Sequence, residues 1–339
     1  MPGGGQEAAP SDIVAALERL GLARPGEHPA LEPLTGGVSS DIWKVETASG
    51  TWCLKRALAK LKVAQDWRAP VARSRNEYDW IRTAAAIVPW AAPALAGYDD
   101  AAGVIAMRYY PASDYKLWKA ELAAGRANPA IASAVGTSLA RIHAGTAGNA
   151  DLALRFDTGD IFYAIRLEPY LVATGRAHPE LAGPLARLVE TTASNKLALV
   201  HGDVSPKNIL IGGDGPMFLD AECAWYGDPA FDLAFCLNHM LLKGVWVPGA
   251  FDDFLACFAA LADAYLARVD WEPPADLERR AAHLLPGLFL ARVDGKSPVE
   301  YITADADKDR VRRVAIPLIA APVDRLSAVA AAWRASRGA

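Results

Sequence analysis

Three polar residues in the second half of the chain have types and spacing that suit phosphoryl-transfer chemistry. Asp203 and Asn208 lie five positions apart in the run His-Gly-Asp-Val-Ser-Pro-Lys-Asn, and Asp220 ends a later apolar run. Phosphoryl transfer requires a carboxylate that orients the attacking hydroxyl and oxygen ligands that hold Mg²⁺. The spacing therefore predicts that Asp203 takes the base role and that Asn208 and Asp220 bind the metal ion.

Each of these residues alone also has a purely structural explanation. Gly-Asp and Asn-Ile pairs are common in turns, and an aspartate that ends a strand is often a helix N-cap. The joint order of Asp203, Asn208 and Asp220 favours the catalytic interpretation. Asp228 differs, because an Asp-Pro pair ahead of a helical run is what a capping position needs.

A cation for the nucleotide phosphates is predicted upstream of these residues. Lys55 lies in a strand that follows a hairpin, and Glu77 in the next helix is its predicted ion-pair partner. Arg56 is the alternative if the strand is shifted by one position. A lysine on a strand is often only a solvated edge residue. Its place in the order of motifs favours the phosphate-binding role for Lys55.

The segment Thr35-Gly-Gly-Val-Ser-Ser can form a loop over the phosphates. Glycine lets the backbone approach a ligand closely, so that amide groups and hydroxyls face the anion. A plain β-turn explains these residues nearly as well, but their position ahead of Lys55 favours a nucleotide-binding loop. The predicted contacts are Gly36, Gly37, Ser39 and Ser40.

The ordered motifs resemble those of the aminoglycoside phosphotransferase and choline kinase group of small-molecule kinases, which share the protein-kinase fold. The resemblance covers nearly the whole chain and rests on His-Gly-Asp203, Asn208, Asp220 and the downstream Tyr-Gly-Asp-Pro-Ala-Phe-Asp232. It implies an α+β, two-lobed fold with a small antiparallel-sheet N-lobe and a mostly helical C-lobe. It also implies ATP and Mg²⁺ as cofactors.

The resemblance implies roles for several further residues. His201 and Asp232 are expected to support the catalytic loop from behind. Met107 and Tyr109, at the exit of a predicted strand, are expected to form the hinge whose backbone hydrogen-bonds the adenine ring.

The phosphate acceptor is predicted to be a small molecule. Eleven residues separate Asp220 from Asp232, which leaves little room for the long activation segment with which a protein kinase binds a peptide. Asp220-Ala-Glu222 is similar to the Asp-x-Glu element of methylthioribose kinases, and Arg292 and Asp294 lie in the region where that family keeps a sugar-contacting arginine. We therefore expect a sugar or polyol acceptor, with Glu222, Arg292 and Asp294 as candidate contacts.

Other acceptors stay open from the sequence. Arg292 and Asp294 can equally pair with each other or cap a helix end. An aminoglycoside acceptor would favour an acidic pocket, and residues 244–300 hold nine acidic against five basic side chains, a difference of -4. That excess is equally consistent with solvated helix faces. Choline or another amino alcohol is a further alternative, and a nucleotide-binding pseudokinase without chemistry is the alternative of another class.

The elements that must position these residues fall into two predicted domains. Residues 11–108 are predicted to form the nucleotide-binding lobe, with a helix from Ser11, a hairpin around 42–45 and 51–54, a helix over 74–87 and a strand over 103–107. Residues 1–10, rich in Gly, Pro and Ala, are predicted to be a flexible tail.

Residues 109–339 are predicted to form the helical catalytic and substrate lobe, because strand signals nearly vanish beyond residue 108. The helical patterns cover 131–143, 161–174, 180–193, 231–242, 251–268, 277–291 and 317–334. Residues 197–220 interrupt them with short apolar runs and Gly or Asp turns, which predicts small strands that present the catalytic loop.

The composition is that of an ordinary globular protein, and we expect a cytoplasmic location. Hydrophobic residues make up 52% of the chain, and a net charge of -4 argues against nucleic acid as a partner. Four cysteines without a CxxC pair favour reduced, buried thiols. No apolar run is long enough for a membrane span, and the first residues lack the features of a signal peptide. Whether the chain forms a homodimer stays open.

Overall fold

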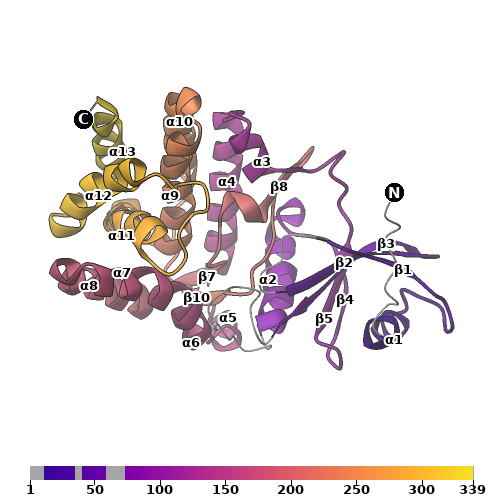
Figure 1. The fold of residues 1–339 in the computed structure, drawn as a ribbon. Coiled ribbons are helices and arrows are strands. Elements are labelled where there is room, and N and C mark those ends of the chain that lie inside the picture. Colours follow the sequence, from indigo (N-terminus) through magenta and orange to yellow (C-terminus); the bar gives the residue numbers. More distant parts are fainter. Residues whose placement is uncertain (1–10, 35–39, 59–72, 339) are drawn as a thin grey trace.

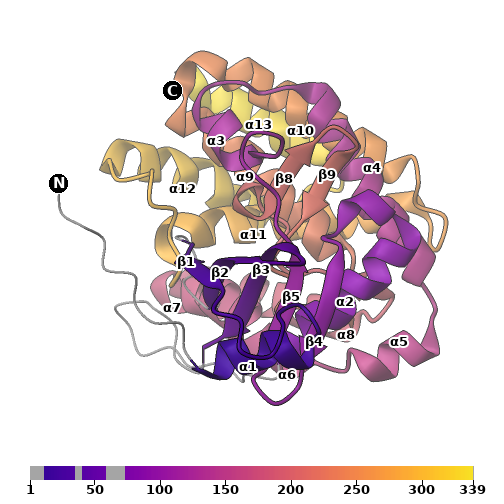
Figure 2. The same ribbon diagram turned by 90° about the vertical axis from the view of Figure 1, so that its right-hand side faces the viewer.

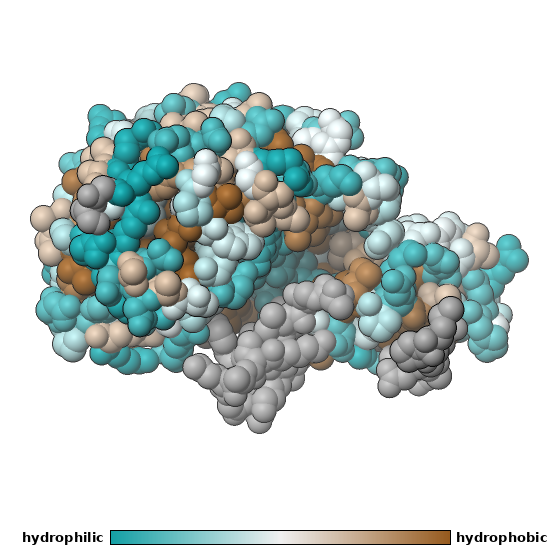
Figure 3. Space-filling view, turned by 45° about the horizontal axis from the view of Figure 1, so that its top comes forward, coloured by the Kyte–Doolittle hydropathy of each residue, from teal (hydrophilic) through white to brown (hydrophobic). Residues whose placement is uncertain are grey.

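The computed structural model describes residues 11–34, 40–58 and 73–338. They form a smaller lobe built on a β-sheet and a larger lobe of helices (Figure 1). A hollow separates the two lobes on the face shown in Figure 3. The predicted two-lobed α+β architecture is confirmed. The predicted flexible tail lies outside the described residues.

The sheet of the smaller lobe is antiparallel and, within the described residues, has the strand order β1-β2-β3-β5-β4. The strands are β1 (Ala30–Pro33), β2 (Ser40–Thr47), β3 (Gly50–Ala57), β4 (Leu95–Asp99) and β5 (Val104–Arg108). Strands β2 and β3 form the predicted hairpin, in which Thr47 pairs with Gly50 across the turn. Gly50 has a φ of 144°, which favours glycine at this position.

Two helices flank this sheet. In α1 (Ser11–Arg19), Ile13 and Leu17 lie one turn apart and pack in a cluster with sheet residues Trp43, Val45, Leu54, Val104 and Ala106. Helix α2 (Arg73–Ile87) lies beside β4 and β5 (Figure 2) and buries Trp80, Ile81 and Ala84 in the core of the larger lobe. Helix α2 therefore belongs to the packing of both lobes.

The core of the larger lobe surrounds α9 (Ala230–Trp246), in which every residue from Ala230 to Val245 is buried. Helices α4 and α10 pack against each other beside it, and α11 covers another side. The remaining bounds are α3 (Trp118–Ala123), α4 (Pro129–Thr146), α5 (Ala150–Arg155), α6 (Gly159–Phe162), α7 (Ala173–Ala177), α8 (Ala182–Ser194), α10 (Phe251–Leu266), α11 (Pro274–Asp294), α12 (Asp305–Ala320) and α13 (Leu326–Ala335).

The predicted interruption of the helical lobe is confirmed as a set of short strands. They are β6 (Lys116–Leu117), β7 (Ala198–Val200), β8 (Ile209–Gly212), β9 (Gly215–Phe218) and β10 (Trp225–Gly227). Strand β7 pairs with β10, and β8 pairs with both β6 and β9. These pairings hold the ends of the loop formed by residues 201–208, which we call the catalytic loop.

Two helix predictions are corrected by the structure. The single helix predicted over 317–334 is wrong, because α12 ends at Ala320 and α13 begins at Leu326. Ala321 has a φ of -131° and a ψ of 84°, outside the helical region that the following Pro322 disfavours, and this breaks the helix. The segment predicted as one helix over 161–174 contains a π-helix over Tyr163–Val172 with a proline inside.

The four cysteines are free thiols, of which Cys223, Cys236 and Cys257 are buried and Cys53 is half-buried. This agrees with the prediction of reduced, mostly buried thiols. Within the part of the chain that the structure describes, no helix combines the length and the apolar character needed to cross a membrane.

The close contact of α4 with α10 gives a stability prediction. A Cβ at Gly136 of α4 would lie 2.3 Å from the carbonyl oxygen of Leu261 in α10. We expect Gly136→Ala to lower the free energy of unfolding by about 1–3 kcal/mol, because the two helices must separate. Gly183→Ala in α8 is the matched control, since its Cβ would meet nothing closer than 3.7 Å. Urea unfolding measures both variants, and equal stability of the two would contradict this packing.

Candidate active site

The side chain of Asp232 holds the beginning of the catalytic loop. It is fully buried in the first turn of α9, and its two oxygens accept hydrogen bonds from the backbone amides of His201 (2.7 Å) and Gly202 (2.8 Å). The Nε2 atom of His143 lies 3.2 Å from the same carboxylate. Gly202 has a φ of 80°, and a Cβ there would approach the carbonyl oxygen of Cys223 to 2.9 Å. The loop therefore requires glycine beside the aspartate.

The imidazole of His201 ties the catalytic loop to the segment after β9. Its Nδ1 atom accepts a hydrogen bond from the amide of Asp203, and its Nε2 atom donates to the carbonyl of Leu219, each at 3.1 Å. Burial lowers the pKa of His201, which suits these bonds because a neutral ring has one accepting and one donating nitrogen. The structure thus brings together His201 and Asp232, the two residues predicted to support the loop.

The carboxylate of Asp203 is held between two cations. Arg166, on the π-helix, lies 2.8 Å from its Oδ2 atom, and Lys207 lies 3.3 Å from the same oxygen. Arg166 also donates to the carbonyl of Gly202 at 2.5 Å, so one guanidinium fixes both the loop and its carboxylate. Burial alone would raise the pKa of Asp203, but Arg166 and Lys207 outweigh it and hold that pKa below its ordinary value.

The two predicted metal ligands lie on neighbouring segments. The backbone carbonyl of Asn208 accepts a hydrogen bond from the amide of Leu219 at 2.8 Å, next to Asp220 in the chain. The side-chain amide of Asn208 donates to the carbonyl of Asp203 at 3.1 Å, which leaves its Oδ1 oxygen available. Asp220 has a φ of 67°, an uncommon conformation for a residue with a Cβ. Such conformations cluster at functional sites.

Lys55 lies between carboxylates of the two lobes. Leu54 of β3 packs in the cluster under α1, so the next side chain points to the opposite face of the sheet, toward the larger lobe. Its Nζ atom lies 2.7 Å from Oε2 of Glu77 and also contacts Oδ1 of Asp220. The structure therefore puts Lys55 at this position, whereas Arg56 pairs with Asp12 on the other side of the sheet.

The charges of Lys55 and Asp220 stabilise each other, whereas that of Glu77 is opposed by burial. Burial would lower the pKa of Lys55, but Asp220 and Glu77 raise it above its ordinary value. Burial raises the pKa of Glu77, and the nearby Asp220 adds to this effect. The Lys55 ammonium holds the pKa of Asp220 below its ordinary value against the effect of burial. Asp220 is thus an ionised carboxylate at the cleft.

The predicted nucleotide-loop and hinge residues are described only in part. Gly36, Gly37 and Ser39 lie outside the described residues. Ser40 begins β2 and is buried, and its hydroxyl has no hydrogen-bond partner in the described chain. Met107 lies inside β5, between β3 and β4, and the amide of Tyr109 donates to the carbonyl of Thr51 at 3.3 Å. The adenine contacts of Met107 and Tyr109 stay a prediction.

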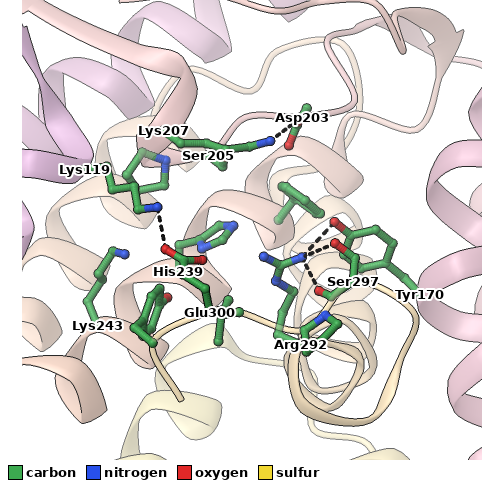
Figure 4. A pocket seen from close by; sticks show the side chains of 15 residues that line it. Lys119, Tyr170, Asp203, Ser205, Lys207, His239, Lys243, Arg292, Ser297 and Glu300 are labelled. Carbon is green, nitrogen blue, oxygen red and sulfur yellow. Dashed lines mark hydrogen bonds and ion pairs between the residues drawn. The ribbon is translucent and has the colours of Figure 1, made fainter. Parts of the chain in front are cut away.

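A pocket opens in front of Asp203 (Figure 4). It is bounded by the catalytic loop, the π-helix, α3, α9, the end of α11 and the segment 297–301. Arg292 lies in its wall, where one guanidinium nitrogen donates to the hydroxyl of Tyr170 (3.0 Å) and to the carbonyl of Ser297 (2.5 Å). The structure therefore brings Arg292, but not Glu222 or Asp294, to the pocket that contains Asp203.

Glu222 and Asp294 are engaged elsewhere. Glu222 accepts from Nε of the buried Arg73 at 2.9 Å. Asp294 ends α11 and lies between His178 (2.7 Å) and Arg312 of α12 (2.6 Å). The pairing of Arg292 with Asp294, which the sequence left open, does not occur in these contacts. The predicted capping role of Asp228 is wrong in position, because the N-cap of α9 is Pro229. Asp228, one residue earlier, accepts from the amide of Ala230 at 3.0 Å and pairs with Arg280.

Sequence reasoning missed several residues of this site. Arg166 carried no local signal, because only folding brings the π-helix onto a loop that begins more than 30 residues later. Lys207 stands inside the catalytic motif, so its charge next to Asp203 was a signal that could have been used. His239 lies in the helix predicted over 231–242, whose pattern indicated only packing, and Lys243 directly follows it. Lys119 lies on α3, for which no helix was predicted.

Comparison with known proteins identifies the family. Residues 30–288 match the phosphotransferase enzyme family, which is more than half of the chain. The chain belongs to this family. The resemblance seen in the sequence is thereby confirmed, and the predicted enzyme class, a small-molecule kinase, is the class of this phosphotransferase family.

Relatives of this phosphotransferase are distant. A methylthioribose kinase of Erwinia tasmaniensis is 26% identical over 286 residues, which cover 71% of this chain and 69% of that protein. A methylthioribose kinase of Pectobacterium atrosepticum is 24% identical, with 68% of this chain and 64% of that protein covered. The matches thus span about two thirds of the length of these relatives.

A solved structure shares the fold. The choline/ethanolamine kinase family protein from Mesorhizobium loti superposes with a TM-score of 0.51 at 19% identity, and the superposition covers 96% of this chain and 99% of that protein. The likeness establishes the two-lobed, protein-kinase-like fold of the phosphotransferase.

The hydrogen bonds from the catalytic loop to the Asp232 carboxylate give a second stability prediction. We expect Asp232→Ala to lower the free energy of unfolding of this phosphotransferase by about 2–5 kcal/mol, because two buried amides lose their acceptor. Asp232→Asn keeps one acceptor oxygen and should cost less. Urea unfolding followed by tryptophan fluorescence measures both. A free energy of unfolding for Asp232→Ala equal to that of the wild type would show that this carboxylate does not support the loop.

Proposed function

We propose that this protein is an ATP- and Mg²⁺-dependent kinase that phosphorylates a hydroxyl group of a small molecule, in the class of sugars and polyols. The observation that carries the proposal is the position of the ionised Asp203 carboxylate in the wall of a pocket, on the same loop as Asn208. Lys55 and Asp220 supply the two charges that a bound Mg²⁺–nucleotide needs next to that loop.

The residues present fit a divalent metal ion of the magnesium type. Among the described residues there is no cluster of three or more His, Cys, Asp or Glu side chains that would form a complete metal site. Mg²⁺ usually binds through one or two protein oxygens together with phosphates and water. The carboxylate of Asp220 and the Oδ1 oxygen of Asn208, which accepts no hydrogen bond from the described part of the chain, match that requirement. When bound, the metal neutralises charge on the transferred phosphoryl group.

The proposed step is an in-line transfer. The acceptor oxygen forms a bond with the γ-phosphorus while the bond from that phosphorus to the bridging oxygen of ADP breaks. The hydroxyl proton passes to the Asp203 carboxylate, and ADP leaves with the bonding electrons. Because two cations hold the pKa of Asp203 low, this carboxylate is a weak base, and its main contribution is to orient the hydroxyl.

The methylthioribose kinases among the relatives favour a sugar-like acceptor. The alternatives are an aminoglycoside and choline or another amino alcohol. The pocket contains Lys119, Lys207, Lys243 and Arg292, whose charges repel a cationic acceptor, so we propose the sugar-like class ahead of both. The excess of acidic side chains in residues 244–300 does not bear on this choice, since Glu300 alone of those nine lines the pocket.

Two variants test the catalytic assignment. We expect Asp203→Asn to reduce turnover by at least about 100-fold while Mg-ATP binding stays close to that of the wild type, because the residue faces the acceptor. Asp220→Ala should weaken Mg-nucleotide binding as well. Coupled ADP release and nucleotide titration measure these effects. Full activity in either variant would contradict the proposal.

A pseudokinase that only binds nucleotide would behave differently. It should show no slow hydrolysis of Mg-ATP in the absence of acceptor, whereas a kinase with an intact set of polar residues should show some. A screen of aminoglycosides, choline, methylthioribose, amino sugars and simple sugars, with Asp203→Asn as the blank, separates the acceptor classes.

The ion pair between Arg166 and Asp203 gives a prediction for pH dependence. Activity requires ionised Asp203, and Arg166 helps to hold the pKa of that carboxyl low. Arg166→Met should therefore raise the pKa and move the acidic limb of the kcat/KM profile to higher pH. Arg187→Met, an exposed residue on α8, is the control and should leave the limb unchanged. If the acidic limb of the kcat/KM profile does not move in Arg166→Met, the ion pair does not lower the pKa of Asp203.

A further inference from the structure

The pocket in front of Asp203 carries more positive charge than its own carboxylates balance. Of the described residues that line it, Lys119, Lys207, Lys243 and Arg292 are cations and Asp203 and Glu300 are carboxylates, so four minus two leaves a net charge of +2. Lys207 pairs with Asp203, and Lys119 pairs with Glu300 at 2.5 Å. Lys243 and Arg292 are left without a carboxylate partner in the described chain.

Lys243 is the most unusual of these groups, because its side chain is buried and forms no ion pair within the described residues. The residue is only 1% exposed, in the last turn of α9. Its ammonium lies 4.2 Å from the ring centroid of Trp246 and 4.0 Å from that of Tyr301, and no hydrogen bond or ion pair to it occurs among the described residues. Burial and the charge of Lys119 lower the pKa of Lys243 to about 7; Glu300 opposes this shift, and Arg292 adds to it.

Further polar groups of the pocket also lack partners. In the described chain, the buried hydroxyl of Tyr301, the Nε atom of Arg292 and the hydroxyl of Ser205 have no hydrogen-bond partner. The ring of His239 is almost fully buried beside them, and burial together with the surrounding cations keeps its pKa well below the ordinary value, so it is neutral. Buried polar groups without partners are costly and rare, and a ligand in this pocket would supply the missing bonds.

We propose that the acceptor of this kinase carries an oxyanion, a carboxylate or a phosphate ester, that binds to Lys243 and Arg292 while the acceptor hydroxyl lies at Asp203. This inference rests on the proposed kinase function and narrows its acceptor from a neutral sugar or polyol to an acidic one. Tyr301 donates a further hydrogen bond to the oxyanion, and His239 lies beside it as a neutral donor.

The arrangement of the pocket supports this division of roles. Figure 4 shows Asp203 and Lys207 at one end of the pocket. Lys243 and Arg292 lie at the other end, on either side of His239 and Glu300. A small molecule with a hydroxyl at one end and an oxyanion at the other therefore matches both sides. An oxyanion also neutralises the excess charge and raises the pKa of Lys243 back toward its ordinary value. Binding of the anion therefore offsets the free energy that burying an unpaired cation costs.

The test compares acceptors that differ only in the charged group. Gluconate is paired with glucitol, and ribose 5-phosphate with ribose, in the coupled ADP-release assay. We expect kcat/KM for at least one charged member to exceed that of its neutral partner by about 10-fold or more, as a charge-assisted hydrogen bond provides. The two pairs also distinguish a carboxylate from a phosphate ester. A neutral member that is used as well as or better than its charged partner in both pairs would overturn the proposal.

Variants of the pocket locate the effect. Lys243→Met should raise KM for the charged acceptor by about 10- to 100-fold with a much smaller effect on the neutral partner. Tyr301→Phe, which removes a single hydroxyl, should raise the same KM by a smaller factor and keeps the test available if Lys243→Met does not fold. Lys196→Met, an exposed lysine outside the pocket, is the matched control and should change neither value. Equal changes for charged and neutral acceptors would contradict the assignment.

A binding measurement separates failure of this inference from failure of the proposed function. Inorganic phosphate is titrated calorimetrically into the protein saturated with Mg-AMP-PNP, which fills the proposed nucleotide site. We expect binding that weakens about 10-fold or more in Lys243→Met, whether or not any acceptor is turned over. Equal affinity in both proteins, or no binding to the wild type, would overturn the oxyanion site. Absence of all Mg-ATP turnover would instead count against the proposed function.

Discussion

The geometry of the site depends on the ammonium group of Lys55, because it joins carboxylates of the two lobes. Glu77 comes from α2 and Asp220 from the segment after β9, and both contact the same Nζ atom. Charges withdrawn from water must be paired, so β3, α2 and the end of β9 are held in a fixed relation. When ligands bind, a metal ion can take the place of the Lys55 ammonium at Asp220, and the nucleotide phosphates can take the place of a carboxylate at Lys55.

The same rule of charge pairing distinguishes the catalytic loop from the pocket in front of it. Around the loop, Asp203 is paired with Arg166 and Lys207, and Asp232 is saturated by two backbone amides. These bonds fix the loop before any ligand arrives. In the pocket, Lys243 has no carboxylate partner in the described chain. The carboxylates that fix the catalytic loop are thus fully paired, whereas the pocket proposed to bind the substrate contains a lysine without a carboxylate partner in the described chain.

The sequence predicted the parts of this arrangement that are local. Asp203, Asn208 and Asp220 were predicted as site residues because their spacing suits chemistry on one loop and the next strand, and the structure places them on that loop and just after β9. Arg166 and Lys243 were not recognised, because their neighbours come from distant helices and their environment exists only after packing. The acidic excess of residues 244–300 left the acceptor undecided for the same reason, since most of these carboxylates lie on outer faces or pair with arginines. The break at Pro322 was overlooked because apolar periodicity continued across it.

The most direct test of the kinase assignment is a crystal structure of the protein with Mg-AMP-PNP. We predict that the metal ion is bound by the Asp220 carboxylate and the Asn208 amide oxygen, that Lys55 contacts the nucleotide phosphates, and that the γ-phosphate faces Asp203. A nucleotide bound away from Lys55, or a metal ion held without Asp220 and Asn208, would contradict the account.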